Sequence, residues 1–159
     1  MPNQPNDNAE HGGLAGRVAT LEALSSLQDV MSRYARFADL ALGSPSHEHA
    51  VALADLFTDD ATADYGPFFG SFSGRAALIN AFENILPAGT RWSAHYIVNP
   101  LLEVSGDTAQ GTWAFLIHAV PRNPPDAGPV TFYGRYEEQL RRVGGTWKIA
   151  SLVVHYSSP

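Results

Sequence analysis

Apolar residues return at helical spacing through much of the first half of the chain. They recur every three or four positions from about residue 18 to a Gly43-Ser-Pro stop, and two later stretches have the same period. The pattern predicts three helices, over about residues 18–43, 47–58 and 74–86. The third of these ends at Pro87-Ala-Gly, where a helix does not continue.

The second half of the chain is rich in strand signals. Four long strands are predicted between turn-forming residues, over about 91–105, 108–120, 129–143 and 146–157. Two short extended segments, at about 61–67 and 68–74, precede the third helix. Helices followed by long, hairpin-linked strands predict an α+β fold, in which an antiparallel sheet curls around the helices. The concave face of such a sheet is the natural site for a small ligand.

Length and composition indicate one folded domain. The 159 residues are 45% hydrophobic, and a chain of that size buries enough surface to fold without disulfides or metal. Residues 1–15 are polar and contain proline and glycine, so we expect a disordered tail followed by a single domain over 16–159. Cysteine is absent, which excludes disulfides, thiolate catalysis and thiolate metal sites.

The charge balance narrows the class of partner. A formal net charge of −6 disfavours nucleic acid and anionic membrane, since both need basic patches. No apolar stretch approaches the roughly 20 residues of a membrane span. The N-terminus lacks the basic start and apolar run of a signal peptide. We therefore expect a cytoplasmic protein whose partner is neither a nucleic acid nor a membrane.

Asp39 and His95 are the main candidates for chemistry. Asp39 lies among apolar residues at the C-terminal end of the first helix, where the helix dipole disfavours an anion. Such a break in a local rule often marks function, and a surface ion pair with Arg36 is the alternative. His95 shares a strand face with Ser93 and Ile97. Alternation alone does not show whether that face is wet or buried, and from the residues alone a structural histidine is the commoner interpretation.

Three further side chains are weaker candidates, namely Tyr34, Tyr65 and His118. Tyr34 belongs to the apolar stripe of the first helix and lies about 140° around that helix from Asp39. Both face one pocket only if the helix end deviates or the cavity wraps around it. Tyr65 and His118 lie in extended segments, where a core or rim position explains them as well as a catalytic role does.

We expect neither a metal nor an organic cofactor. His47 and His49 have the chemistry to chelate an ion, but their segment has the composition of a solvated helix start. The nearby acidic residues Asp59, Asp60 and Asp64 are most simply turn and strand-edge residues.

Several short strings, taken in order, resemble one family. They are Leu27-Gln-Asp-Val, Leu56-Phe-Thr-Asp-Asp-Ala-Thr, Gly74-Arg-Ala-Ala, Ala94-His-Tyr, Val104-Ser-Gly-Asp-Thr-Ala, Gly134-Arg-Tyr and Gly145-Thr-Trp-Lys-Ile. Their order over about residues 20–152 is similar to the SnoaL-like family of the nuclear-transport-factor-2-like superfamily. The resemblance implies a cone-shaped barrel, in which a curved mixed, largely antiparallel sheet wraps around three helices from the N-terminal half. It also implies an apolar cavity and a homodimer through the sheet.

Within that group, the chain resembles enzymes that pair a helix Asp with a strand His. These are scytalone dehydratase, bile-acid 7α-dehydratase and hexachlorocyclohexane dehydrochlorinase. Asp39 and His95 occupy the matching positions. Tyr34 and Tyr65 match pocket tyrosines of the bile-acid enzyme and of scytalone dehydratase, and His118 lies close to a second histidine of scytalone dehydratase.

The resemblance and the Asp–His pair together predict proton-transfer chemistry. A carboxylate that accepts a hydrogen bond from one imidazole nitrogen fixes the tautomer and raises the basicity of the other nitrogen. His95, with Asp39 behind it, would remove a proton from a small apolar substrate of alicyclic, polyketide-like or steroid-like type. Tyr34 or Tyr65 would donate to the developing oxyanion, and His118 would protonate a departing hydroxyl. The prediction is a cofactor-independent lyase or isomerase, in particular a dehydratase.

Two other classes of function stay open, because this scaffold hosts several activities. A polyketide cyclase or an epoxide-opening hydrolase would use similar residues in a pocket of different shape. A non-catalytic, dimeric small-molecule-binding module would have Asp39 and His95 pointing apart or into solvent. The substrate is open too, because Leu152 stands where the dehydrochlorinase and bile-acid enzymes carry an arginine.

Overall fold

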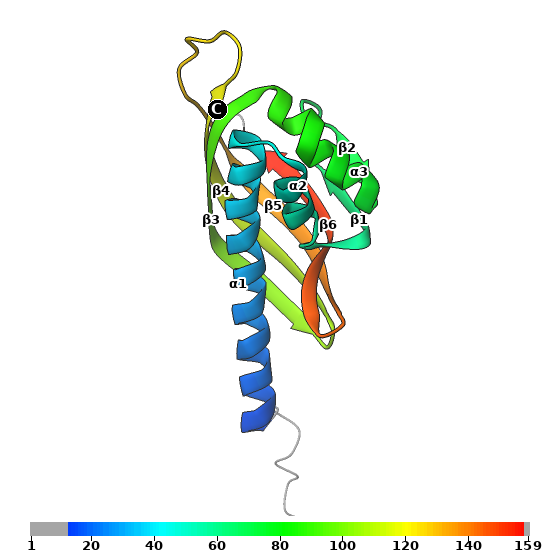
Figure 1. Cartoon of the computed structure of the whole chain (residues 1–159). Helices are drawn as coiled ribbons and strands as arrows, with labels where there is room; N and C mark the ends of the chain where they lie inside the picture. The colour runs from blue at the N-terminus through cyan, green and yellow to red at the C-terminus, as the bar shows by residue number, and fades with distance from the viewer. Residues whose placement is uncertain (1–12, 158–159) are drawn as a thin grey trace, which may run out of the picture.

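Six strands form one sheet, and the helices lie against one of its faces (Figure 1). The computed structural model describes residues 13–157. Helices α1 (Leu14–Gly43) and α2 (His47–Ala54) come first, and the strands follow as β1 (Phe57–Asp64), β2 (Ser71–Ser73), β3 (Thr90–Ser105), β4 (Thr108–Pro121), β5 (Val130–Val143) and β6 (Thr146–Tyr156). A third helical segment between β2 and β3 consists of α3 (Arg75–Asn80), the π-helical turn η1 (Ala81–Ile85) and the 3-10 turn η2 (Leu86–Ala88).

The sheet is mixed and open. Its strand order is β2-β1-β6-β5-β4-β3, so β2 and β3 are edge strands that do not pair with each other. Strand β1 runs parallel to β6, and the other neighbouring pairs in the described chain are antiparallel. The predicted α+β class is therefore confirmed, with a curved, largely antiparallel sheet against three helical segments. The sheet curls around the helices without closing into a barrel.

The predicted limits of the elements are good for the long strands and poorer for the helices. Each of β3 to β6 agrees with its prediction to within one residue at either end. Helix α1 begins at Leu14, so the end of the predicted 1–15 tail is helical, and residues 1–12 of that tail lie outside the described chain. The predicted second helix is too long, because Phe57 and Thr58 begin β1 instead. Phe57 is fully buried and pairs with Ile149 of β6, so tertiary pairing overrides the local helical pattern.

The third helical segment changes its winding along its length. It is α-helical to Asn80, π-helical from Ala81 and 3-10 from Leu86. A π-helical turn is rare and frequently lies at a functional site. Here the segment presents Phe82 and Leu86 to the space between the helices and the sheet, where both line a cavity.

Helix α1 covers the sheet with one face. Its buried residues recur at helical spacing and are Ala23, Leu27, Val30, Met31, Tyr34, Ala38 and Ala41. Each buried side chain the size of leucine contributes roughly 1.5–3 kcal/mol, so this stripe fixes α1 on the sheet. The helix is 30 residues long. No helix within residues 13–157 is long and apolar enough to cross a membrane.

Alternation along the strands decides which side chains face the helices. On β4, Trp113, Phe115 and Ile117 are buried on the helix side. Leu116 and His118 occupy the intervening positions and point to the outer face of the sheet, because successive side chains on a strand point to opposite faces. The inner face of the sheet is thus apolar over most of its width.

One inward position on β5 carries a carboxyl group. Glu138 is 1% exposed, and its Oε2 accepts a hydrogen bond from Trp113 Nε1 over 3.1 Å. Its Oε1 has no hydrogen-bond partner within the described chain. Burial raises the pKa of Glu138 to about 8, so the side chain is neutral at pH 7.

This buried carboxyl group should make folding stability depend on pH. In the unfolded chain Glu138 ionises near its ordinary pKa of 4.5, whereas in the folded chain it does so at about 8. The free energy of unfolding therefore falls as the pH rises from 4.5, the pKa in the unfolded chain, through about 8, the pKa in the folded chain. Glu138→Gln keeps an acceptor for Trp113 and cannot ionise. Relative to wild type, its free energy of unfolding should gain at least about 1.4 kcal/mol between pH 5 and pH 8, the worth of one pKa unit.

Urea unfolding at both pH values measures this gain. Glu22→Gln is the matched control, because Glu22 is an exposed residue of α1 and the same change there should leave the pH dependence as in wild type. A difference between wild type and Glu138→Gln that does not vary with pH would contradict the prediction.

Candidate active site

A cavity lies between the helices and the inner face of the sheet. With its mouth included, it contains about 710 Å³ of space free of protein atoms. Tyr34 and Phe82 belong to its helical wall, and His95, Tyr136 and Tyr156 belong to its sheet wall. Most of the lining is aliphatic or aromatic, and its polar side-chain atoms are those of hydroxyl groups and one imidazole. No Lys, Arg, Asp or Glu within residues 13–157 lines it.

Asp39 and His95 meet at the side of this cavity. Asp39 lies near the C-terminal end of α1 and His95 lies on β3, and the packing of α1 on β3 brings them together. With its proton on Nδ1, His95 donates a hydrogen bond to Asp39 Oδ1 over 2.6 Å. The imidazole is 6% exposed and the Asp39 side chain 30% exposed. Nε2, on the other edge of the ring, has no hydrogen-bond partner within the described chain, and the His95 side chain lines the cavity.

Two further donors hold the Asp39 carboxylate. Ser93 Oγ donates to Oδ1 over 2.8 Å, and the backbone N–H of His95 donates to Oδ2 over 3.2 Å. Hydrogen bonds to the ionised form offset the unfavourable helix dipole at this end of α1. Sequence reasoning did not select Ser93. The available signal was its spacing of two from His95, which puts both side chains on one face of β3.

The structure shows how Tyr34 and Asp39 can serve one site from different sides of α1. Tyr34 lines the cavity, whereas Asp39 lies behind the imidazole and does not line it. Their separation of about 140° around the helix is then no obstacle, because only Tyr34 has to face a ligand. The alternative surface pair is not formed in the described chain, where Asp39 pairs with His95 and not with Arg36.

Tyr34 and Tyr65 bring two hydroxyl groups into the cavity. The Tyr34 hydroxyl donates to the Tyr65 hydroxyl over 3.3 Å, and both side chains are buried. Burial raises the pKa of Tyr34 and of Tyr65 above the ordinary value of 10, so both remain protonated and able to donate. Tyr136 and Tyr156, which sequence reasoning did not select, also line the cavity. Burial raises the pKa of Tyr136 as well, and that of Tyr156 to about 12.

Three aromatic rings form the part of the wall that lies across the sheet from His95. The ring centroids of Phe69, Phe132 and Tyr156 are 6.0, 6.1 and 6.0 Å apart, so each ring contacts the other two. Gly134 lets β5 and β6 approach closely beside Tyr156, since a Cβ there would lie 2.0 Å from a backbone oxygen of β6. This wall offers apolar ring surfaces to a ligand.

His118 does not join the site, which corrects the expected role of this residue as an acid in the cavity. Ile117 and Ala119 line the cavity, so the intervening His118 points to the outer face of the sheet. There its Nδ1 lies 3.0 Å from Thr131 Oγ1, and its ring packs against Tyr96. The shift of one strand position is what separates this histidine from the cavity.

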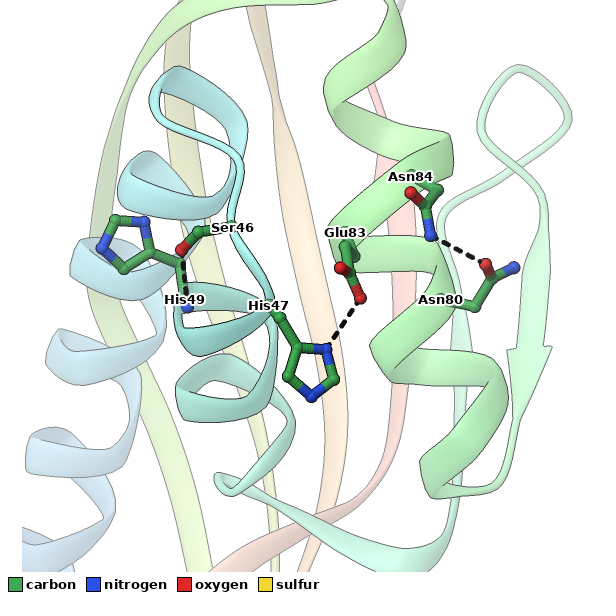
Figure 2. Close-up of polar contacts among 6 residues, drawn as sticks. All are labelled: Ser46, His47, His49, Asn80, Glu83 and Asn84. Carbon is green, nitrogen blue, oxygen red and sulfur yellow. Dashed lines mark hydrogen bonds and ion pairs between the residues drawn. The ribbon is translucent and has the colours of Figure 1, made fainter.

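The two histidines at the start of α2 point to different sides of that helix (Figure 2). His47 Nδ1 lies 2.9 Å from Glu83 Oε2, a contact that links α2 to η1. His49 Nδ1 lies 2.7 Å from the Ser44 carbonyl oxygen, and its backbone N–H donates to the side chain of Ser46, the N-cap. Across residues 13–157, no group of three or more His, Cys, Asp or Glu is arranged to hold a metal ion.

The chain has the fold of solved proteins that are described as nuclear-transport-factor-2-like and cystatin-like. It belongs to the SnoaL-like family, whose domain pattern matches residues 19–153. That range includes Asp39, His95 and every strand except the end of β6. No curated protein matches the chain in sequence.

Solved structures of similar fold include three proteins from the bacterial genus Novosphingobium. A protein provisionally assigned as an aromatic ring hydroxylase, from Novosphingobium aromaticivorans, is 29% identical, with 87% of this chain and 92% of that chain covered and a TM-score of 0.74. A provisionally assigned scytalone dehydratase from the same organism is 24% identical, with 87% of each chain covered and a TM-score of 0.74. A type 3 hexachlorocyclohexane dehydrochlorinase from Novosphingobium barchaimii is 20% identical, with 89% of this chain and 91% of that chain covered and a TM-score of 0.71.

The buried tyrosines of the cavity should stay protonated in mildly alkaline solution. Tyr34→Phe and Tyr65→Phe should therefore give the same phenolate absorbance as the native wild type at every pH up to 11, because neither hydroxyl contributes to that signal. After unfolding in guanidinium, each variant should show one ionising tyrosine fewer than wild type. A native variant that loses phenolate signal below pH 11 would contradict the burial of that hydroxyl.

Proposed function

We propose that this protein is a cofactor-independent lyase or isomerase, and in particular a dehydratase. The observation that carries the proposal is the 2.6 Å hydrogen bond between Asp39 and His95 at the side of an apolar cavity that His95 lines. An oriented imidazole with one nitrogen turned to the ligand space is what a general base requires. A module that only binds a ligand has no need of it.

The proposed reaction starts when His95 Nε2 takes a proton from the carbon next to a substrate carbonyl. The electrons of the broken C–H bond shift toward the carbonyl oxygen, which accepts a hydrogen bond from the Tyr65 hydroxyl, to which the Tyr34 hydroxyl donates. They then form a C=C bond and expel a hydroxyl group from the neighbouring carbon. The imidazolium of His95 returns its proton to that hydroxyl, so water leaves and the histidine is neutral again. Between the two steps Asp39 stabilises the positive charge on His95.

The cavity supports a substrate that is uncharged and largely apolar. Within the described chain no charged side chain lines it, and burying an unpaired anion there would cost far more than burying a ring. Leu152 is fully buried and lies outside the lining, so this position supplies no cation to the cavity. The rings of Phe69, Phe132 and Tyr156 suit an alicyclic, polyketide-like or steroid-like compound.

Two of the similar structures have names that denote eliminations. A dehydratase removes water and a dehydrochlorinase removes hydrogen chloride, so both reactions begin or proceed by loss of a proton from carbon. The Asp–His pair of this chain and the names of these two similar proteins therefore both support an elimination. Because no Lys or Arg of the described residues lines the cavity, loss of a hydroxyl protonated by His95 fits this chain better than loss of a halide.

Cyclic β-hydroxy ketones test the proposed function directly. A panel of β-hydroxycyclohexanones, β-hydroxytetralones and β-hydroxy ketosteroids should contain compounds that wild type converts to enones, with the enone absorbance as readout. His95→Ala should reduce the turnover number by about 100-fold or more, as expected for removal of a general base. Tyr65→Phe, which keeps the ring and removes the hydroxyl, should reduce it by about 10-fold or more.

His118→Ala is the matched histidine control and should turn over substrate at the wild-type rate, because His118 faces away from the cavity. Equal rates for wild type and His95→Ala would remove His95 from the mechanism. Binding of the panel without turnover would instead favour a non-catalytic binding module.

We also propose that two copies of the chain associate through the outer face of the sheet. Large apolar side chains are exposed on this side of β3 to β5, namely Trp92, Tyr96, Val98, Leu116 and Tyr133. Trp92 and Tyr96 are 50% and 54% exposed, which is costly for ring surfaces of this size. A second copy is the occupant that offers the same apolar surface, since a two-fold interface is self-complementary.

Introducing negative charge on this apolar surface should dissociate the dimer. Trp92→Glu combined with Tyr96→Glu should reduce the mass measured by light scattering from twice the chain mass to the chain mass. Phe68→Glu is the control, because Phe68 is 87% exposed but lies on the turn between β1 and β2 and not on β3 to β5. A wild-type protein of single-chain mass at micromolar concentration would contradict the proposed dimer.

A further inference from the structure

Ser93 has a contact that the proposed proton transfer does not by itself explain. It is 4% exposed on β3, lines the cavity and donates its hydroxyl to Asp39 Oδ1 over 2.8 Å. The same oxygen accepts the bond from His95 Nδ1 over 2.6 Å. Two donors, Ser93 Oγ and His95 Nδ1, therefore share one carboxylate oxygen, Asp39 Oδ1.

Asp39 needs such support because its surroundings do not otherwise fix it. Its side chain is 30% exposed, so water competes for its oxygens. It lies near the C-terminal end of α1, where the helix dipole disfavours an anion, and Arg36 is one turn away as an alternative partner. The backbone N–H of His95 holds Oδ2 over 3.2 Å, a longer contact than the two at Oδ1. Ser93 is thus the side chain that decides which way Oδ1 points.

We propose that Ser93 is a positioning residue, which holds Asp39 so that His95 keeps its proton on Nδ1 and presents an unprotonated Nε2 to the cavity. The position of the proton on a neutral imidazole is set by the hydrogen bond that the other nitrogen makes. An Oδ1 that already accepts from Ser93 is also a weaker acceptor of a proton from Nδ1, so the proton stays on the ring. This inference rests on the proposed function for its use, since Nε2 is the base of that reaction.

The arrangement predicts a spectroscopic signature in the free protein. In the full-length chain with ¹⁵N-labelled histidine, long-range ¹H–¹⁵N correlation spectra above the pH of imidazole protonation should show His95 with a protonated Nδ1 and an unprotonated Nε2. The His95 signals are those that disappear in His95→Gln. In Ser93→Ala the Nε2-protonated tautomer should appear beside the first or replace it, because the carboxylate is free to turn away.

Three variants separate this role from a packing role. Ser93→Thr keeps the hydroxyl and should keep the wild-type tautomer, whereas Ser93→Cys keeps the size, has a weak donor and should behave like Ser93→Ala. Thr90→Val is the matched control, because Thr90 also lines the cavity from β3 but makes no hydrogen bond with Asp39 in the described chain. Its His95 spectrum should be that of wild type. Thermal unfolding of each variant checks that it is folded.

The outcomes decide the inference whether or not a substrate has been found. A His95 tautomer unchanged in both Ser93→Ala and Ser93→Cys overturns it, and so does a change of equal size in Thr90→Val. If Ser93→Ala does not fold, Ser93→Cys against Ser93→Thr makes the same comparison. A tautomer that follows Ser93 in a protein that turns over no substrate upholds the positioning role and contradicts only the proposed function.

Where turnover is measured, the kinetic constants give a second readout. Ser93→Ala should lower kcat about tenfold, less than the roughly 100-fold or greater loss expected for His95→Ala. KM should stay within about twofold of wild type, because the apolar walls that bind the substrate are unchanged. Ser93→Thr should restore most of kcat. A rise in KM without a fall in kcat would make Ser93 a binding residue and overturn its positioning role.

Discussion

The packing of α1 across β3 is the constraint on which the candidate site depends. The stripe of buried residues on α1 fixes the rotation of the helix, and that rotation puts Tyr34 into the cavity and Asp39 beside it. Strand β3 supplies Ser93 and His95 on one face, because they are two residues apart. The Asp39–His95 hydrogen bond therefore exists because two long elements, each fixed by many apolar contacts, cross at one place. A rotation of α1 would separate the carboxylate from the imidazole and disturb the buried stripe at the same time.

The ionisable groups around the cavity are divided by environment. Burial keeps Tyr34, Tyr65 and Tyr136 protonated, and the carboxyl group of Glu138 is neutral for the same reason. Asp39, by contrast, has three hydrogen-bond donors and partial access to water. The cavity thus combines neutral hydroxyl donors with one imidazole whose partner is a carboxylate outside the ligand space. The imidazole is therefore the group in this low-dielectric cavity on which positive charge can develop, because the carboxylate beside it stabilises that charge.

The fold was more predictable from the sequence than the site was. Long strands bounded by glycine and proline turns were placed to within a residue, because turn chemistry is local. Phe57 was assigned to a helix, because the pairing that makes it a strand residue involves Ile149, far along the chain. The face on which His118 lies could not be predicted from the resemblance, because an alignment error of one residue moves a strand side chain to the opposite face of the sheet. Ser93 has the local signal of sharing a strand face with His95, but its contact with Asp39 is three-dimensional, and Tyr136 and Tyr156 belong to the site only through their proximity to the cavity.

The contact between Asp39 Oδ2 and the backbone N–H of His95 has a consequence for solubility. Strand β3 is an edge strand, and unpaired backbone donors on an edge are where a strand of another chain can add to the sheet. The carboxylate occupies such a donor, and α1 lies along the strand that carries it. The group that orients the imidazole therefore also caps the edge of the sheet. Loss of the Asp39 carboxylate would therefore remove the partner of the imidazole and also expose a backbone donor on the edge of the sheet.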